Sequence, residues 1–141
     1  WFMAEGYAVT GVDVSAAMLE IARTRWPGGD WRRADMRALD LGEAFDGIVA
    51  WDSFFHLSPD DQRACIARMA RRRAPRGALL LTVGPDAAEA EGTVGGEPVY
   101  HASLSPAEYA ACVEAAGMRL TGFLAEDPET DRHSVLMARK T

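Results

Sequence analysis

The stretch Tyr7-Ala-Val-Thr-Gly-Val-Asp13-Val14-Ser15 decides the fold. Its apolar run predicts a buried strand that ends at Asp13, and residues 16–25 follow with apolar side chains at helical spacing. A carboxylate at the end of such a strand is the group with which α/β nucleotide-binding folds accept hydrogen bonds from ribose hydroxyls. The competing interpretation is that Asp13 only caps the helix that follows it.

Strands and helices alternate along most of the remaining sequence. Further strands are predicted at Trp31–Ala34, Phe45–Trp51, Ala78–Val83, Met118–Glu126 and His133–Arg139. Two more helices are predicted from Ser58 to about Arg73 and from Ser105 to Gly117, and Gly84 to about Leu104 is predicted to be a long loop. This alternation is typical of a parallel sheet covered by helices on both faces. The last two strands adjoin too closely for a crossover helix, so one of them must run antiparallel.

The beginning of the sequence lacks an element that this kind of fold usually has. Only a fragment of an amphipathic helix, from Trp1 to Glu5, precedes the first predicted strand. No glycine-rich turn stands before that fragment, so we expect that the opening strand of the sheet is missing from this sequence.

Composition and charge exclude several classes of protein. The 141 residues, 48% of them apolar, fit a single domain, 1–141, with a hydrophobic core. A net charge of −6 argues against nucleic acid as a partner. No apolar run is long enough to span a membrane, so a cytoplasmic location is the default expectation.

Cysteine and histidine spacing indicates no metal site. Cys65 and Cys112 lie far apart on the apolar stripes of two predicted helices, which favours two buried thiols over a disulfide. Among the candidate ligands, no short-range metal-binding spacing joins His56, His101, Cys65 and Asp52, and we predict no bound metal.

The carboxyl ends of the predicted strands are where a ligand should bind. Asp13 and Asp35 stand at two of these ends, 22 residues apart. This pair fits an adenosine, because one carboxylate can hold the ribose diol and the other the exocyclic amine of adenine. The apolar side chains of Val14 and Met36 could lie on the two sides of the ring.

Four motifs in this order carry a family resemblance. They are Val12-Asp-Val-Ser15 with Met18, Leu19 and Ala22; Ala34-Asp-Met36; Phe45-Asp-Gly-Ile-Val49 with Phe55-His-Leu57; and Ala74-Pro-Arg-Gly-Ala-Leu-Leu80. Together they resemble the class I S-adenosylmethionine-dependent methyltransferases, and more narrowly their small-molecule branch.

The resemblance implies a Rossmann-like, doubly wound, mostly parallel sheet with an antiparallel last strand. It implies S-adenosylmethionine as the cofactor, with Asp13 on the ribose, Asp35 and Met36 beside adenine, and Trp51 at the methionine end. The candidate cofactor-binding residues are Asp13, Val14, Met18, Asp35, Met36, Trp51 and Asp52. The family's first strand and glycine-rich turn are absent, and that strand would lie mid-sheet. We therefore expect the chain to be a methyltransferase fragment that binds the cofactor poorly by itself.

Methyl transfer from a sulfonium is an in-line displacement, in which the enzyme aligns the acceptor and removes a proton where needed. The candidate catalytic residues are His56, Tyr100 and His101. For His56 we favour a structural or helix-capping role over catalysis. His101 beside Tyr100 is the better candidate for the acceptor site, and His133 is expected to lie at the surface.

Two other functions compete with methyl transfer to a small-molecule acceptor. A short-chain NAD(P)-dependent dehydrogenase needs a Tyr-x-x-x-Lys pair, whereas the residues four places after Tyr7, Tyr100 and Tyr109 are Gly11, Leu104 and Val113. A non-catalytic methyltransferase-like binding module is the second alternative. The identity of the acceptor and the oligomeric state stay open.

Overall fold

The structure, a computed structural model, describes residues 1–140 apart from the side chain of residue 73. Contacts within the chain divide it into two compact units, Trp1–Leu39 and a second unit that starts at Asp40. Each unit is described by itself, and the single domain predicted over residues 1–141 stays a prediction. Of the helices described, none is both long and apolar enough to cross a lipid bilayer.

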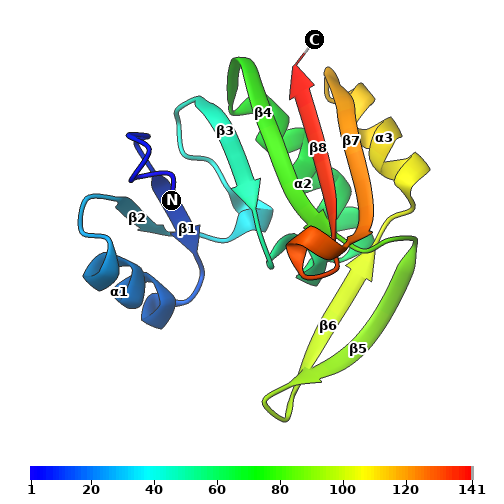
Figure 1. The fold of residues 1–141 in the computed structure, drawn as a ribbon, viewed down its shortest axis with the longest axis horizontal. Coiled ribbons are helices and arrows are strands. Elements are labelled where there is room, and N and C mark those ends of the chain that lie inside the picture. The colour runs from blue at the N-terminus through cyan, green and yellow to red at the C-terminus, as the bar shows by residue number, and fades with distance from the viewer. Residues whose placement is uncertain (141) are drawn as a thin grey trace. The chain divides into compact units, whose positions relative to one another are not determined.

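The first unit is a strand–helix–strand element. Its parts are β1 (Thr10–Asp13), α1 (Ala16–Arg25), β2 (Asp30–Arg33) and the short 3₁₀ helix η1 (Met36–Ala38). The two strands are parallel, with Asp13 paired to Arg33 (Figure 1). The predicted helix is confirmed in full, and the first strand starts at Thr10 rather than at Tyr7.

The absence of a side chain at Gly11 makes room for the indole ring of Trp31 in the first unit. The indole of Trp31 lies so near Gly11 that a Cβ at residue 11 would stand 2.1 Å from the ring. The indole N–H also donates to the carbonyl of Trp26, at 2.8 Å, just after α1. Trp31 therefore connects both strands with the end of the helix, and a larger residue than glycine at position 11 would displace it.

The predicted helix fragment at Trp1–Glu5 is a hydrogen-bonded turn instead. The Glu5 N–H donates to the Trp1 carbonyl, and the Tyr7 and Gly6 N–H groups donate to the carbonyls of Phe2 and Met3. The last two bonds follow the pattern with which helices end, so the chain leaves the helical path after a single turn.

The second unit holds the larger sheet. Its elements are β3 (Phe45–Ala50), η2 (Phe54–His56), α2 (Pro59–Arg71), β4 (Arg73–Val83), β5 (Ala88–Val94), β6 (Glu97–Ser103), α3 (Pro106–Ala115), β7 (Met118–Asp127), η3 (Pro128–Thr130) and β8 (His133–Lys140). The order of the four-stranded sheet is β3-β4-β8-β7. β3 and β4 are parallel, while β8 is antiparallel to both of its neighbours, which confirms the predicted reversal of the last strand.

Helices α2 and α3 cover one face of this sheet (Figure 1). The buried side chains of Leu79, Leu81 and Leu136 alternate along β4 and β8 with residues of the other face. On that other face, Val49 of β3 is 45% exposed. We predicted helices on both faces of the sheet. Within the second unit, the described helices cover only one of these faces.

The predicted boundaries between α2 and β4 differ most from those in the structure. Helix α2 ends at Arg71 rather than at about Arg73, and β4 begins at residue 73 rather than at Ala78. The pairing of β3 with β4 is irregular at this point, and Arg76 has a left-handed φ of 67°. The strand therefore begins earlier than predicted and contains a bend near Arg76.

The predicted loop from Gly84 to about Leu104 contains a β-hairpin. β5 and β6 pair in antiparallel register from Ala88–Ser103 to Val94–Glu97 and extend beyond the end of the sheet (Figure 1). Gly95 and Gly96 join the two strands and have φ values of 61° and 87°. Two consecutive residues with positive φ are typical of a tight hairpin turn, and glycine adopts this conformation readily. The Gly-Gly pair is a sequence signal for a hairpin. The glutamates around it obscured the alternation of apolar and polar residues that indicates strands.

Buried hydrogen bonds attach this hairpin to both helices. The hydroxyl of Tyr109 on α3 donates to Oε1 of Gln62 on α2, at 2.6 Å, and both side chains are fully buried. The Gln62 amide donates in turn to the carbonyl of Ala102 on β6, at 2.8 Å. The Leu104 N–H donates to the Tyr109 hydroxyl at 3.2 Å, so the Gln62 side chain and the Tyr109 hydroxyl both have partners inside the core.

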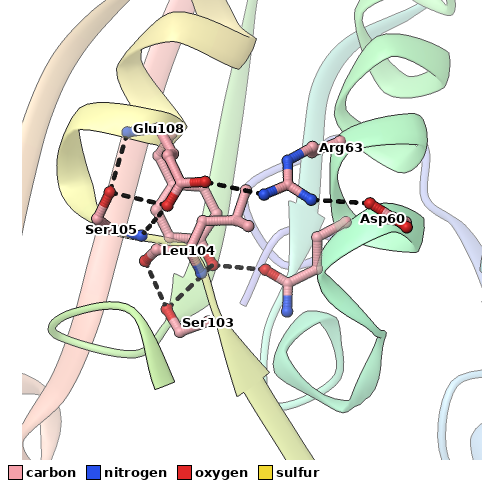
Figure 2. A network of polar contacts seen from close by, with 8 residues as sticks. Asp60, Arg63, Ser103, Leu104, Ser105 and Glu108 are labelled. Atoms are coloured by element: carbon pink, nitrogen blue, oxygen red, sulfur yellow. Dashed lines mark hydrogen bonds and ion pairs between the residues drawn. The ribbon is translucent and has the colours of Figure 1, made fainter. Parts of the chain in front are cut away.

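A more exposed layer of charges lies beside these bonds, as Figure 2 shows. Arg63 on α2 pairs with Glu108 on α3 at 2.8 Å and with Asp60 at 2.9 Å. Glu108 and Ser105 also form the capping box at the start of α3.

The predicted helix starts at Ser58 and Ser105 are confirmed, because both serine side chains accept an N–H of the first turn.

Replacing the Tyr109 hydroxyl tests the importance of the buried hydrogen bonds. Tyr109→Phe leaves the Gln62 oxygen and the Leu104 N–H without this partner inside the core. We expect the free energy of unfolding, measured in urea, to fall by about 1–3 kcal/mol. Tyr7→Phe is the matched control, because Tyr7 is 61% exposed. Equal effects of the two substitutions would contradict the role given to Tyr109.

Candidate functional site

The carboxyl ends of β1 and β2 lie side by side in the first unit. The Ala34 N–H donates to the Asp13 carbonyl at 3.1 Å, and Nε of Arg33 donates to the Val14 carbonyl at 3.1 Å. The segments that follow the two strands are therefore neighbours at one edge. This is the arrangement that the prediction of a shared adenosine site at Asp13 and Asp35 requires.

Asp13 is half-buried and uses one of its two carboxylate oxygens. Oδ1 accepts the N–H of Ser15 at 2.7 Å, while Ser15 itself caps α1 by accepting the N–H of Met18. Oδ2 accepts no hydrogen bond from the parts of the chain that the structure describes. The cap of α1 is therefore Ser15 and not Asp13, so the competing interpretation is not met. One oxygen of Asp13 holds the Ser15 N–H, and the other is open to a ligand donor.

Asp35 already holds a partner on each oxygen. Its Oδ1 accepts the backbone N–H of Arg37 at 2.8 Å, and its Oδ2 lies 2.6 Å from Nη2 of the same arginine. The hydrogen bonds from the Arg37 side chain lower the pKa of Asp35, which keeps it ionised. An adenine amine would compete with Arg37, a neighbour that the sequence prediction did not consider.

Apolar side chains around these carboxylates are open to solvent. Val14 is 56% exposed and Met18 is 54% exposed, whereas Met36 is half-buried. Val14 directly follows Asp13, and Met18 lies in the first turn of the helix that Ser15 caps. They offer apolar area beside a hydrogen-bond acceptor, which is what binding a nucleoside requires.

In the second unit, Trp51 and Asp52 follow the end of β3 and meet a residue from the last strand. Oδ1 of Asp52 lies 2.6 Å from Nε2 of His133, and the rings of Trp51 and His133 are 5.1 Å apart. His133 was predicted to lie at the surface, and its side chain is only 24% exposed. No local pattern marks this contact, because 81 residues separate the two partners.

Of the three predicted catalytic residues, only His56 and His101 bring their side chains together, next to the hairpin strand that carries Tyr100 and His101. Nδ1 of His56 donates to the backbone carbonyl of Tyr100 at 3.0 Å. The His101 ring lies 4.8 Å from that of His56 and stacks on Phe55 at 5.4 Å. His56 therefore links η2 to β6, as a structural role requires. His101 makes ring contacts only, and neither of its nitrogens hydrogen-bonds within the described residues.

Tyr100 is not a base at neutral pH. Its hydroxyl donates to Oε1 of Glu89 at 2.5 Å, and this hydrogen bond raises the pKa of Tyr100 to about 12. Because side chains alternate along a strand, Tyr100 and His101 point to opposite faces of β6. The two predicted catalytic residues thus belong to different surfaces of the hairpin.

A pocket of about 280 Å³ lies on the His101 side of the hairpin. Its wall is mostly apolar and includes Phe55, Gly84, Ala88, Ala90, His101 and Ser103. An imidazole in such a wall can take up a proton from a small molecule bound in the pocket. Within the part of the chain that the structure describes, no group of three metal-ligating side chains occurs.

Comparison with known proteins places this geometry in a family context. A family model described as "Methyltransferase domain" matches residues 1–77. A relative from Saccharopolyspora spinosa, a dTDP-4-amino-2,3,4,6-tetradeoxy-D-glucose N,N-dimethyltransferase, is 38% identical over 82 residues. That match covers 57% of this chain and 33% of the relative, so the chain spans about a third of the relative's length.

Solved structures share the fold. An S-adenosylmethionine-dependent methyltransferase from Clostridium acetobutylicum has a TM-score of 0.79 at 9% identity, over 99% of this chain and 77% of its own. The amino pentose methyltransferase CalS10 from Micromonospora echinaspora, solved with SAM bound, has a TM-score of 0.78 at 22% identity, with 99% and 77% covered.

These likenesses confirm the Rossmann-like α/β fold. Because the matched residues 1–77 are more than half of the 141 residues, the chain belongs to the methyltransferase-domain family.

Proposed function

We propose that this protein transfers a methyl group from S-adenosylmethionine to an amine nitrogen of a small molecule. The observation that carries this proposal is the half-buried Asp13 carboxylate, with one oxygen fixed and the other open, at the end of β1. Family membership supports the reaction class. The nitrogen acceptor is supported by the relative from Saccharopolyspora spinosa, whose name describes N,N-dimethylation of an amino sugar.

The residues of the first unit fit the adenosine part of the cofactor. Oδ2 of Asp13 is available to accept a ribose hydroxyl while Oδ1 holds Ser15. Val14 and Met18 provide exposed apolar area for the adenine ring. Asp35 would join the site only if its carboxylate exchanged Arg37 for the adenine amine. When bound, the cofactor supplies a methyl group on a sulfonium, which needs no further activation.

The second unit offers groups for the acceptor. An ammonium acceptor must lose a proton before its nitrogen can attack, and His101 is the imidazole best placed to take that proton. His56 holds the strand that carries His101 through the Tyr100 carbonyl. Tyr100 keeps its own proton, because its hydroxyl is bound to Glu89. Trp51 and Asp52 remain predicted contacts of the cofactor.

Asp13→Asn tests the ribose contact. The asparagine oxygen can still accept the Ser15 N–H, while the charged acceptor for the ribose is lost. We expect the Kd for S-adenosylhomocysteine, measured by calorimetry on the full-length natural protein, to rise about tenfold or more.

The matched control for this measurement is Asp30→Asn. Asp30 lies at the opposite end of the same strand pair and binds Arg32, so its substitution should leave the Kd unchanged. If Asp13→Asn binds as tightly as the unaltered protein, the ribose assignment is wrong.

His101→Gln tests proton removal from the acceptor. Loss of a general base should lower kcat by about a hundredfold or more. The assay measures release of S-adenosylhomocysteine with a panel of small amines that includes a dTDP-amino sugar.

His56→Asn is the control for the His101 substitution, because it retains an N–H near the Tyr100 carbonyl. It should lower kcat by less than about tenfold, since it acts only by holding the strand. The reverse ranking of the two variants would transfer the role of base to His56.

A further inference from the structure

Asp52 has a backbone conformation that needs support from its surroundings. Its φ is 49°, in the left-handed region that residues other than glycine seldom adopt. Its N–H donates to Oγ1 of Thr82 at 2.9 Å, and Thr82 on β4 is fully buried. Strained residues of this kind persist where the structure around them holds them, and they gather at functional sites.

His133 supplies the second constraint on Asp52. Its Nε2 lies 2.6 Å from Oδ1 of Asp52, and its Nδ1 lies 2.5 Å from the carbonyl oxygen of Thr130. A carbonyl and a carboxylate can only accept, so both ring nitrogens must donate. The ring that satisfies both bonds is the doubly protonated imidazolium.

The charges around His133 favour this cationic form. The hydrogen bond to the Thr130 carbonyl and then the one to Asp52 raise the pKa of His133 above its ordinary value of 6.5, with a smaller contribution from Asp131. Asp127 is paired with His133 across β7 and β8 and adds a further negative charge nearby. Arg132 is the adjacent cation, and it extends to Glu126 at 3.7 Å.

The same imidazole contacts Trp51. Their ring centroids are 5.1 Å apart with an interplanar angle of 39°, which is within the range for attraction between a cation and an aromatic ring. His133 thus contacts two consecutive residues at the end of β3. Oδ2 of Asp52 accepts no hydrogen bond within the described residues, and Trp51 is 43% exposed, so both keep a surface for a ligand.

We propose that His133 is a positioning residue, which as an imidazolium fixes the Asp52 carboxylate and the Trp51 indole in the orientation that binds the cofactor. This inference rests on the proposed function. The direction of its pH dependence follows from the raised pKa of His133. The contribution of His133 is complete below the ordinary histidine value and is lost as the pH rises through the higher value of the folded state.

Nitrogen NMR of the histidine rings tests the ion pair without any cofactor. In the full-length natural protein, both ring nitrogens of His133 should show the protonated form at neutral pH. Asp52→Asn should lower the pH at which they lose it, whereas Asp131→Asn, which changes a charge without removing a hydrogen bond, should lower it less. A neutral ring with one unprotonated nitrogen at pH 7 would overturn the inference.

Binding of S-adenosylhomocysteine tests the positioning role. His133→Gln should weaken binding about tenfold at pH 6. We expect the unaltered protein to lose affinity as the pH rises, and the affinity of His133→Gln should not show this loss. Identical affinities and pH profiles of the two proteins would refute the role while leaving the proposed function intact. If the unaltered protein binds no S-adenosylhomocysteine at any pH, the proposed function fails, and only the NMR result on the ion pair stands. If His133→Gln does not fold, Asp52→Asn and the NMR measurement decide the question.

Discussion

The buried hydrogen bond from Tyr109 to Gln62 fixes the two helices that support the hairpin with the candidate acceptor residue His101. It joins α3 to α2, and the Gln62 amide continues to the carbonyl of Ala102 in the hairpin. The neighbouring residue, His101, is therefore carried on a strand whose base is fixed inside the core. The pocket with its apolar wall and the His101 imidazole lies on this strand, next to the hydrogen bonds that join the base of the hairpin to the helices.

In both units, candidate cofactor-binding carboxylates lie at the carboxyl ends of parallel strands. The contacts that fix these carboxylates differ between the two units. In the first unit the carboxylates are fixed locally, Asp13 by Ser15 and Asp35 by Arg37, each two residues further along the chain. In the second unit Asp52 is fixed by Thr82 on β4 and His133 on β8, which lie far from it in the sequence. The first kind of site depends on short turns, and the second depends on the pairing of the sheet.

This difference explains what could be predicted from the sequence. The helix starts at Ser58 and Ser105 were predictable, because a cap and its first turn lie within four residues. For the first helix the candidate cap was Asp13, whereas the structure shows Ser15. The reversed last strand followed from its short connection. The contact of His133 with Asp52 carries no local signal, since only the antiparallel pairing of β8 brings it to the end of β3. The hairpin had a local signal at Gly95-Gly96, which the acidic composition of the segment obscured.

A structure of the full-length natural protein with S-adenosylhomocysteine would test the central claim, that Asp13 holds the ribose of the methyl donor, most directly. The account predicts a ribose hydroxyl within hydrogen-bond distance of Oδ2 of Asp13, while Oδ1 still accepts the Ser15 N–H. A ligand bound elsewhere, with Asp13 in contact with Ser15 alone, would contradict it.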